Sequence, residues 1–72
     1  MRIMVKLFAS FRTGRFQEKA LDVRGEARVR EVVAELGLPA PGILLVNERH
    51  AGLDDVLHEG DAVHLFPPVG GG

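Results

Sequence analysis

Apolar and polar residues alternate at the beginning of the chain, with the period of two that is typical of β-strands. This pattern predicts one strand at Arg2–Phe8 and a second at Phe16–Val23. Residues 9–15 contain Ser, Thr and Gly, so we expect them to form the turn of an antiparallel hairpin. The apolar core face of this hairpin is expected to carry Ile3, Val5, Leu7, Leu21 and Val23, and the opposite face of its first strand Met4, Lys6 and Phe8.

The period changes to that of a helix over residues 27–36. Four apolar residues there fall at i, i+3, i+4 and i+7, and these are Val29, Val32, Val33 and Leu36. Gly37 is expected to end the helix in the left-handed conformation, and no Ser, Thr, Asp or Asn stands at residues 25–27 to cap its start. Glu26 and Arg30 have the spacing of a favourable ion pair along a helix.

Short strands separated by turns are predicted for the rest of the chain. Ile43–Asn47 is an apolar run, and Asn47-Glu48 is expected to turn it into a brief return strand at 49–51. Leu53–Leu57 supplies apolar anchors, which we expect to form a single helical turn, and residues 59–61 are a turn signal. Ala62–Phe66 is the last strand, with Val63 and Leu65 on one face.

These elements predict an α+β fold with a mixed sheet of four to five strands and one helix packed on one face. The first and last strands are expected to be central neighbours. The uncovered face then displays Met4, Phe8, His64 and Phe66, with Leu44 or Val46 beside them. Because an apolar patch on an uncovered sheet is typical of a contact surface, these residues are predicted to bind a partner.

A glycine-rich tail follows the last strand. Pro67 and Pro68 cannot continue a strand ladder and hold the chain extended, so the domain is predicted at residues 1–67 and a tail at 68–72. Glycine is costly to order, and a run of it is poorly suited to packing against the body. From Val69 onward the tail can span about 13 Å and enter a channel too narrow for side chains. The residues expected to thread in this way are Pro67, Pro68, Val69, Gly70 and Gly71.

Composition excludes several kinds of site. The 72 residues contain no cysteine, which excludes thiolate nucleophiles and cysteine-ligated metals within this chain. The net charge of −1 argues against nucleic-acid binding, and the three histidines lack metal-ligand spacing. The N-terminal residues show no signal peptide and no membrane span, so we expect a cytoplasmic protein with no bound metal.

The order of elements and the tail together resemble the ubiquitin-like β-grasp sulfur carriers of the MoaD/ThiS type, in particular the small subunit of molybdopterin synthase. Phe66-Pro67-Pro68-Val69 before Gly71-Gly72 carries the resemblance. Supporting segments are 29–32, 36–37, 45–47 and 57–63. The family commonly has a polar cap near Ala27, a glycine at the position of Glu48, and Ser or Ala at that of Gly70.

The resemblance implies that Gly72 is the reactive residue, through its terminal carboxylate. A separate, ubiquitin-activating-like enzyme would use ATP to adenylate it, so no cofactor is expected on this chain. A persulfide donor would convert the adenylate to a thiocarboxylate, and the tail would deliver its sulfur inside the large subunit of molybdopterin synthase. The protein is thus expected to be a carrier subunit and not an enzyme.

Other functions stay open at this stage. Related carriers serve thiamin biosynthesis, RNA thiolation and tungsten cofactors, and ubiquitin-like modifiers join the same Gly-Gly end to lysine side chains. A third interpretation is a plain binding module that uses the open sheet face and not the tail.

Overall fold

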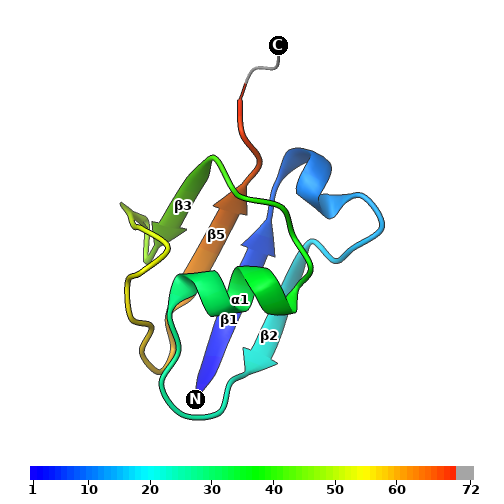
Figure 1. Ribbon diagram of the computed structural model, residues 1–72. Coiled ribbons are helices and arrows are strands. Elements are labelled where there is room, and N and C mark those ends of the chain that lie inside the picture. The colour runs from blue at the N-terminus through cyan, green and yellow to red at the C-terminus, as the bar shows by residue number, and fades with distance from the viewer. Residues whose placement is uncertain (70–72) are drawn as a thin grey trace.

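The computed structural model describes residues 1–69 and contains one five-stranded sheet with an α-helix against one face (Figure 1). The elements in chain order are β1 Arg2–Leu7, the 3₁₀ helix η1 Ala9–Arg12, β2 Glu18–Asp22, α1 Val29–Glu35, β3 Ile43–Val46, β4 Arg49–His50 and β5 Ala62–Phe66. Each predicted strand and the predicted helix is present. The differences are a shorter helix, a 3₁₀ helix in the first turn, and no helical turn at residues 53–57.

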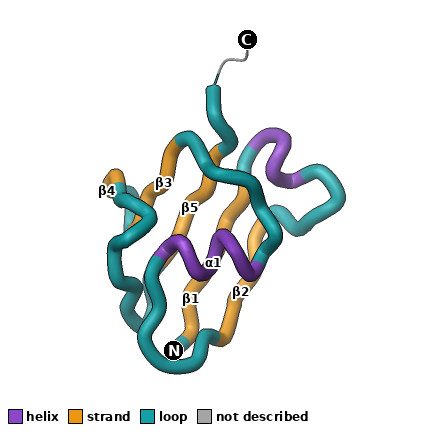
Figure 2. The backbone as a smooth tube through the Cα atoms, viewed as in Figure 1, coloured by secondary structure: helices purple, strands orange, loops and turns teal. Residues whose placement is uncertain are grey.

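The strand order is β2-β1-β5-β3-β4, so the first and last strands are central neighbours as predicted. β1 and β5 run parallel, in register from Met4 opposite Ala62 to Leu7 opposite Leu65. The flanking pairs, β1 with β2 and β5 with β3, are antiparallel. The helix crosses the middle of the sheet on one side, and the other side carries no helix among the described residues (Figure 2).

The core lies between α1 and the sheet. Val5, Leu7, Val29, Val63 and Leu65 are completely inaccessible to solvent. The sequence pattern identified most of this core but not Phe11, which η1 buries at the upper end of the sheet. The whole buried cluster consists of Ile3, Val5, Leu7, Phe11, Val29, Val32, Val33, Leu38, Leu44, Leu57, Val63 and Leu65.

The start of α1 is capped by a residue within the helix, and its end is marked by a glycine. The helix begins at Val29, two residues later than predicted, and the Glu31 carboxylate accepts the Arg28 backbone N–H at 2.7 Å. The capping acceptor therefore comes from the first turn of the helix and not from the residue before it. Gly37 ends the helix with φ of +68°, as predicted.

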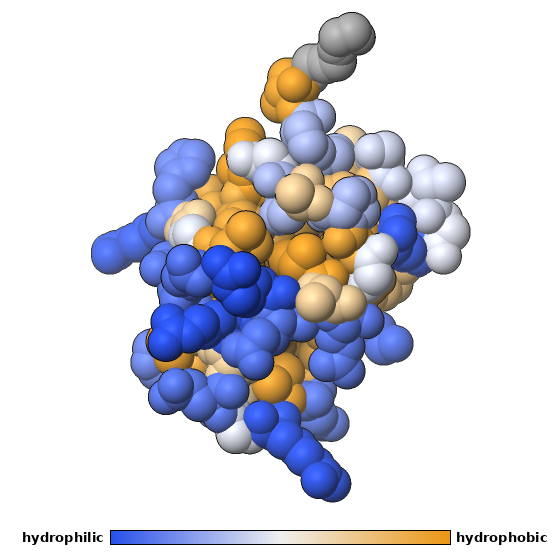
Figure 3. All heavy atoms as spheres, in the orientation of Figure 1, coloured by the Kyte–Doolittle hydropathy of each residue, from blue (hydrophilic) through white to orange (hydrophobic). Residues whose placement is uncertain are grey.

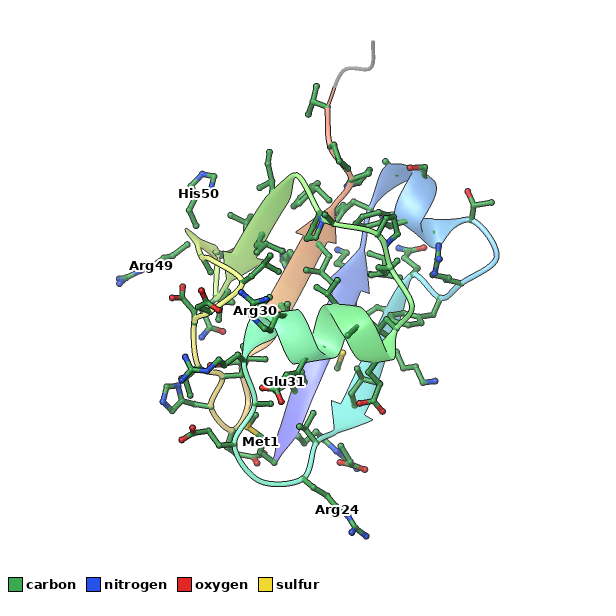
Figure 4. The ribbon with its side chains drawn as sticks, in the orientation of Figure 1. Met1, Arg24, Arg30, Glu31, Arg49 and His50 are labelled. Atoms are coloured by element: carbon green, nitrogen blue, oxygen red, sulfur yellow. The ribbon has the colours of Figure 1, made fainter. Side chains whose placement is uncertain are left out.

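The predicted ion pair between Glu26 and Arg30 is wrong, because residue 26 lies outside the helix. Arg30 instead binds Asp54 in the loop between β4 and β5, with 2.6 Å between Nη2 and Oδ1. Figure 4 shows the Arg30 side chain directed from α1 toward this loop. The carboxylate of Asp55 accepts the Gly52 N–H at 2.9 Å. Asp54 thus ties the loop between β4 and β5 to the helix, and the Asp55 carboxylate braces the loop internally.

The hairpin of β3 and β4 turns at Asn47 and Glu48, which have φ of +53° and +67°. Two successive positive values are required by the tight turn that suits a two-residue hairpin. The Asn47 side chain donates to Asp61 Oδ1 at 2.8 Å and accepts the Ala62 N–H at 2.9 Å. Asp61, only 9% exposed, also accepts the His58 N–H at 2.7 Å, so this turn is fastened to the start of β5.

Candidate functional site

The tail leaves the body where β5 ends. Pro67 has no N–H to donate to a ladder, and the last carbonyl of β5, on Phe66, accepts the backbone N–H of Gly42 at 2.9 Å. Pro67 is half-buried and Pro68 is exposed, while 87% of the Val69 surface is accessible to solvent. In Figures 1 and 3 the last described residues stand clear of the sheet and the helix. Gly70, Gly71 and Gly72, on which the predicted chemistry falls, lie outside the described residues.

Next to the root of the tail, the uncovered face of the sheet carries an apolar surface. Pairing places the side chains of Ile43 opposite Phe66 and Leu45 opposite His64 on this face. Met4, 39% exposed, lies opposite Ala62 on the same side. We call the following residues the open-face patch: Met4, Phe8, Ile43, Leu45, His64 and Phe66.

The predicted partner-binding residues are brought together in this patch, but the prediction for β3 is wrong. Leu44 lies opposite Leu65 and is only 7% exposed, and Val46 lies opposite Val63. Both face the core, because successive residues of a strand point to opposite sides. Ile43 and Leu45 take their place on the open face.

Two aromatic rings form the part of the patch that lies at the tail root. Phe8 and Phe66 stack with ring centroids 4.1 Å apart and planes inclined by 10°. His64 lies against the same Phe8 ring at 5.5 Å, tilted by 57°. The last side chain before the prolines is therefore held in place by a neighbouring strand end, which fixes the point from which the tail departs.

Two cations flank Phe8. The Lys6 ammonium is 5.4 Å and the Arg12 guanidinium 5.5 Å from the centre of its ring. Arg12 Nε also donates to the Leu7 carbonyl at 2.8 Å, which orients the guanidinium. Sequence reasoning missed Arg12 as a site residue, and the signal for it was its position four residues after Phe8 in a one-turn helix. These cations make the edge of the patch positively charged.

A further ion pair lies at the opposite end of the open face from the tail. Arg2 Nε donates to Asp22 Oδ1 at 3.0 Å. This hydrogen bond and the positive charge of Arg2 hold the pKa of Asp22 below its ordinary value. The same hydrogen bond and the negative charge of Asp22 raise the pKa of Arg2. Both side chains are well exposed, so the pair contributes little to stability.

The described residues offer a surface at the tail root and not an enclosed site. One hollow of about 450 Å³ lies between β2 and α1, and another of about 400 Å³ lies beside the turn of β3 and β4. Neither is lined by the open-face patch or by residues 67–69. His50, labelled with Arg49 at the outer strand in Figure 4, is exposed, and no group of three potential metal ligands occurs among residues 1–69. Over the same residues, no helix has the length and hydropathy needed to cross a bilayer.

The chain matches one family model and is similar to several solved structures. The model of the ThiS family matches residues 5–72. A search of curated proteins found no match. A Pyrococcus furiosus protein assigned as subunit 1 of a molybdopterin converting factor is 30% identical, with a TM-score of 0.78 over 96% of this chain and 99% of its own.

Two further solved structures have the same arrangement. Small archaeal modifier protein 1 of Haloferax volcanii is 27% identical, with a TM-score of 0.78 over 94% of this chain and 98% of its own. A chain from the complex of subunits 1 and 2 of the molybdopterin-converting factor of Helicobacter pylori has a TM-score of 0.67, over 100% of this chain and 100% of its own. Its 21% identity makes this a likeness of fold alone. The predicted ubiquitin-like β-grasp fold is confirmed.

Proposed function

Because the chain belongs to the ThiS family, we propose that it is a sulfur carrier whose Gly72 carboxylate is converted to a thiocarboxylate. The observation that carries the proposal is the way the chain leaves the body. β5 stops at two prolines and Val69 is 87% exposed, so the chain has left the body of the domain by residue 69. A carrier needs this arrangement, since its end group must reach the active sites of other proteins.

A free carboxylate is a poor acyl donor, because attack on it would have to expel oxide. In the proposed sequence an activating enzyme joins the Gly72 carboxylate to the α-phosphate of ATP and releases pyrophosphate. The terminal sulfur of a persulfide then attacks the acyl carbon and AMP leaves. A thiol cleaves the resulting sulfur–sulfur bond, which leaves the thiocarboxylate on Gly72 and a disulfide on the donor side. This chain supplies the acyl group, and ATP is bound by the activating enzyme.

The most specific role we propose is that of the small, non-catalytic subunit of a molybdopterin synthase. The relative from Pyrococcus furiosus, assigned as subunit 1 of a molybdopterin converting factor, supports this role at 30% identity over nearly the whole length. The open-face patch would bind the large subunit, and residues 67–72 would thread into its active site. Docking beside the tail root converts sulfur transfer to the pterin precursor into an effectively unimolecular step.

Protein modification is the second candidate, and the likeness to small archaeal modifier protein 1 favours it. In that case Gly72 would form an isopeptide bond with a lysine of a target protein. The two functions share adenylation and differ in the nucleophile that takes the acyl group. Both use the same tail, so the body alone does not distinguish them.

Mass spectrometry of the protein purified from its own cells tests the proposal. We expect a fraction whose C-terminal peptide carries sulfur in place of one oxygen, and we expect this species to disappear when one alanine is added after Gly72. The added residue moves the acyl carbon by roughly 3.5 Å and leaves the body unchanged. Conjugates to other proteins without the sulfur-containing species would favour modification. A sulfur pathway that still runs after deletion of Gly71 and Gly72 would contradict both.

A further inference from the structure

Among the glycines of residues 1–69, Gly42 stands out because a close contact, and not its backbone conformation, leaves no room for a side chain. Gly14, Gly25, Gly37 and Gly60 have positive φ, which glycine adopts most easily. A Cβ added to any of them would meet nothing within 4 Å. At Gly42 no positive φ occurs, and a Cβ would lie 2.5 Å from Pro68 Cα and 2.9 Å from the Pro67 carbonyl oxygen.

The contact at Gly42 is one of backbone against backbone. The Cβ would also lie 3.0 Å from Pro68 N, so all three nearest atoms belong to the main chain of the two prolines. Main-chain atoms cannot rotate away as the end of a long side chain does. The proline rings also fix φ at both residues, which leaves the tail root few ways to yield. An alanine at this position therefore requires the segment 67–68, the loop at 42, or both to move.

The same glycine holds the tail root from the other side. Its N–H donates to the Phe66 carbonyl at 2.9 Å, immediately before the prolines. Gly42 thus binds the end of β5 to the loop that precedes β3. Because it has no side chain, the main chain of Pro67 and Pro68 can lie directly against it. Together with the stack of Phe8 on Phe66, this fixes both the point and the direction of departure of the tail.

From this geometry we infer that Gly42 is a positioning residue for the tail: it sets the direction in which residues 67–69 leave the domain. The inference deepens the proposed function and rests on it, because direction matters only if the end of the chain must enter a partner's active site while the body is docked. A misplacement of about 1 Å at a reacting centre lowers rates by up to about a hundredfold.

The variant Gly42→Ala tests the inference, and Gly52→Ala is the matched control. Gly52 also lacks a positive φ, is exposed, and has nothing within 4 Å of an added Cβ. The measurements are the rate of Gly72 adenylation, followed as pyrophosphate release with the activating enzyme of the same organism, and the affinity of the body for that enzyme. We expect Gly42→Ala to lower the turnover number about tenfold or more with affinity nearly unchanged. We expect Gly52→Ala to leave both at the level of the unsubstituted protein.

A structural measurement separates failure of this inference from failure of the proposed function. In the unsubstituted protein, nuclear Overhauser contacts are expected between the Gly42 α-protons and Pro68, and they should be lost or altered in Gly42→Ala but kept in Gly52→Ala. If the unsubstituted protein has the contacts but is never adenylated, the proposed function fails. If adenylation occurs and Gly42→Ala keeps its full rate, the positioning role of Gly42 is overturned.

A second variant covers the case in which Gly42→Ala does not fold. Pro68→Gly leaves Gly42 and the sheet intact but frees φ at the tail root. We expect its unfolding temperature to stay within a few degrees of that of the unsubstituted protein. Its adenylation rate should fall, as expected for Gly42→Ala. An undiminished rate in this variant would also overturn the inference.

Discussion

At the scale of single residues, Phe8 links the body of the domain to the tail. Its ring stacks on Phe66, and Lys6 and Arg12 lie within 5.5 Å of its centre. The ring is half-buried, so part of its surface is available to a partner. Large aromatic residues and arginine are the side chains most often found at the energetic centre of an interface. The proposed docking surface therefore has its centre at Phe8 and Phe66, directly beside the tail root.

Phe8→Ala is expected to weaken partner binding by about tenfold to a hundredfold, because it removes one ring of the stack. Phe16→Ala is a matched control, since Phe16 is also half-buried and has Lys19 at 5.8 Å from its ring, but it is not part of the open-face patch. Both variants should lose roughly 1–2 kcal/mol of folding stability. Calorimetric titration with the partner checks the difference. Equal losses of affinity in both variants would contradict a specific role for Phe8.

Asp61 contributes to stability, because its buried carboxylate accepts hydrogen bonds from the Asn47 side chain and from the His58 N–H. Asp61→Ala leaves both donors without their acceptor and should lower the free energy of unfolding by about 2–3 kcal/mol. Asp61→Asn keeps one acceptor oxygen and should lose less. Chemical denaturation measures both values. A loss below 1 kcal/mol for Asp61→Ala would mean that water replaces the carboxylate at no cost.

At the scale of elements, the turn between β3 and β4 contains a strained residue. Glu48 has φ of +67°, a value that costs a residue with a side chain about 1 kcal/mol and glycine very little. Glu48→Gly is therefore expected to raise the free energy of unfolding by about 0.5–1 kcal/mol despite the greater entropy of glycine in the unfolded chain. Glu48→Ala removes the charge but keeps Cβ, and it should give no such gain. A gain of the same size in both variants would assign the effect to charge.

The elements differ in how far the sequence determines them. β1 and β5 were predicted with the correct faces, because their apolar and polar residues alternate. β3 is apolar throughout, so its sequence does not show which residues face the core. Only its pairing with β5 decides that Leu44 faces the core and Ile43 the open face. Phe11 was missed because a single 3₁₀ turn has no period.

The candidate site shows the same division. Phe8, Phe66, Met4 and His64 were found by alternation along two strands that were correctly paired. Gly42 was not found, because its contact is with residues of the tail root that are distant in sequence. Its only local signal is Pro41-Gly42, which is typical of any loop. Contacts between distant main-chain segments leave no pattern in the sequence of either segment.

At the scale of the whole molecule, the two sides of the sheet differ in what they carry. One side carries α1 and the core, and Figure 3 shows that its surface combines hydrophilic side chains with apolar areas between them. The other side carries the open-face patch next to the tail root. Changes on the outer surface of α1 should therefore affect solubility and stability slightly and leave docking unaffected.

A pair of variants with the same change in charge tests this separation. Met4→Arg adds one positive charge to the open-face patch, and Glu35→Gln removes one negative charge from exposed α1. We expect Met4→Arg to weaken the complex with the partner by tenfold or more, since it places a hydrated cation in an apolar contact. Glu35→Gln should not change it. Sedimentation or titration of each variant provides the measurement, and an equal effect of the two would show that the partner does not use the open face.

The central position of β5 has a consequence for how the protein is made. β5 pairs with both β1 and β3, and its Val63 and Leu65 are completely buried, so a nascent chain that lacks residues 62–66 lacks the middle of its sheet. The sheet therefore cannot be completed until β5 has been synthesised, whatever the state of the preceding strands. A chain that ends before β5 lacks both the centre of the sheet and the strand from which the tail departs.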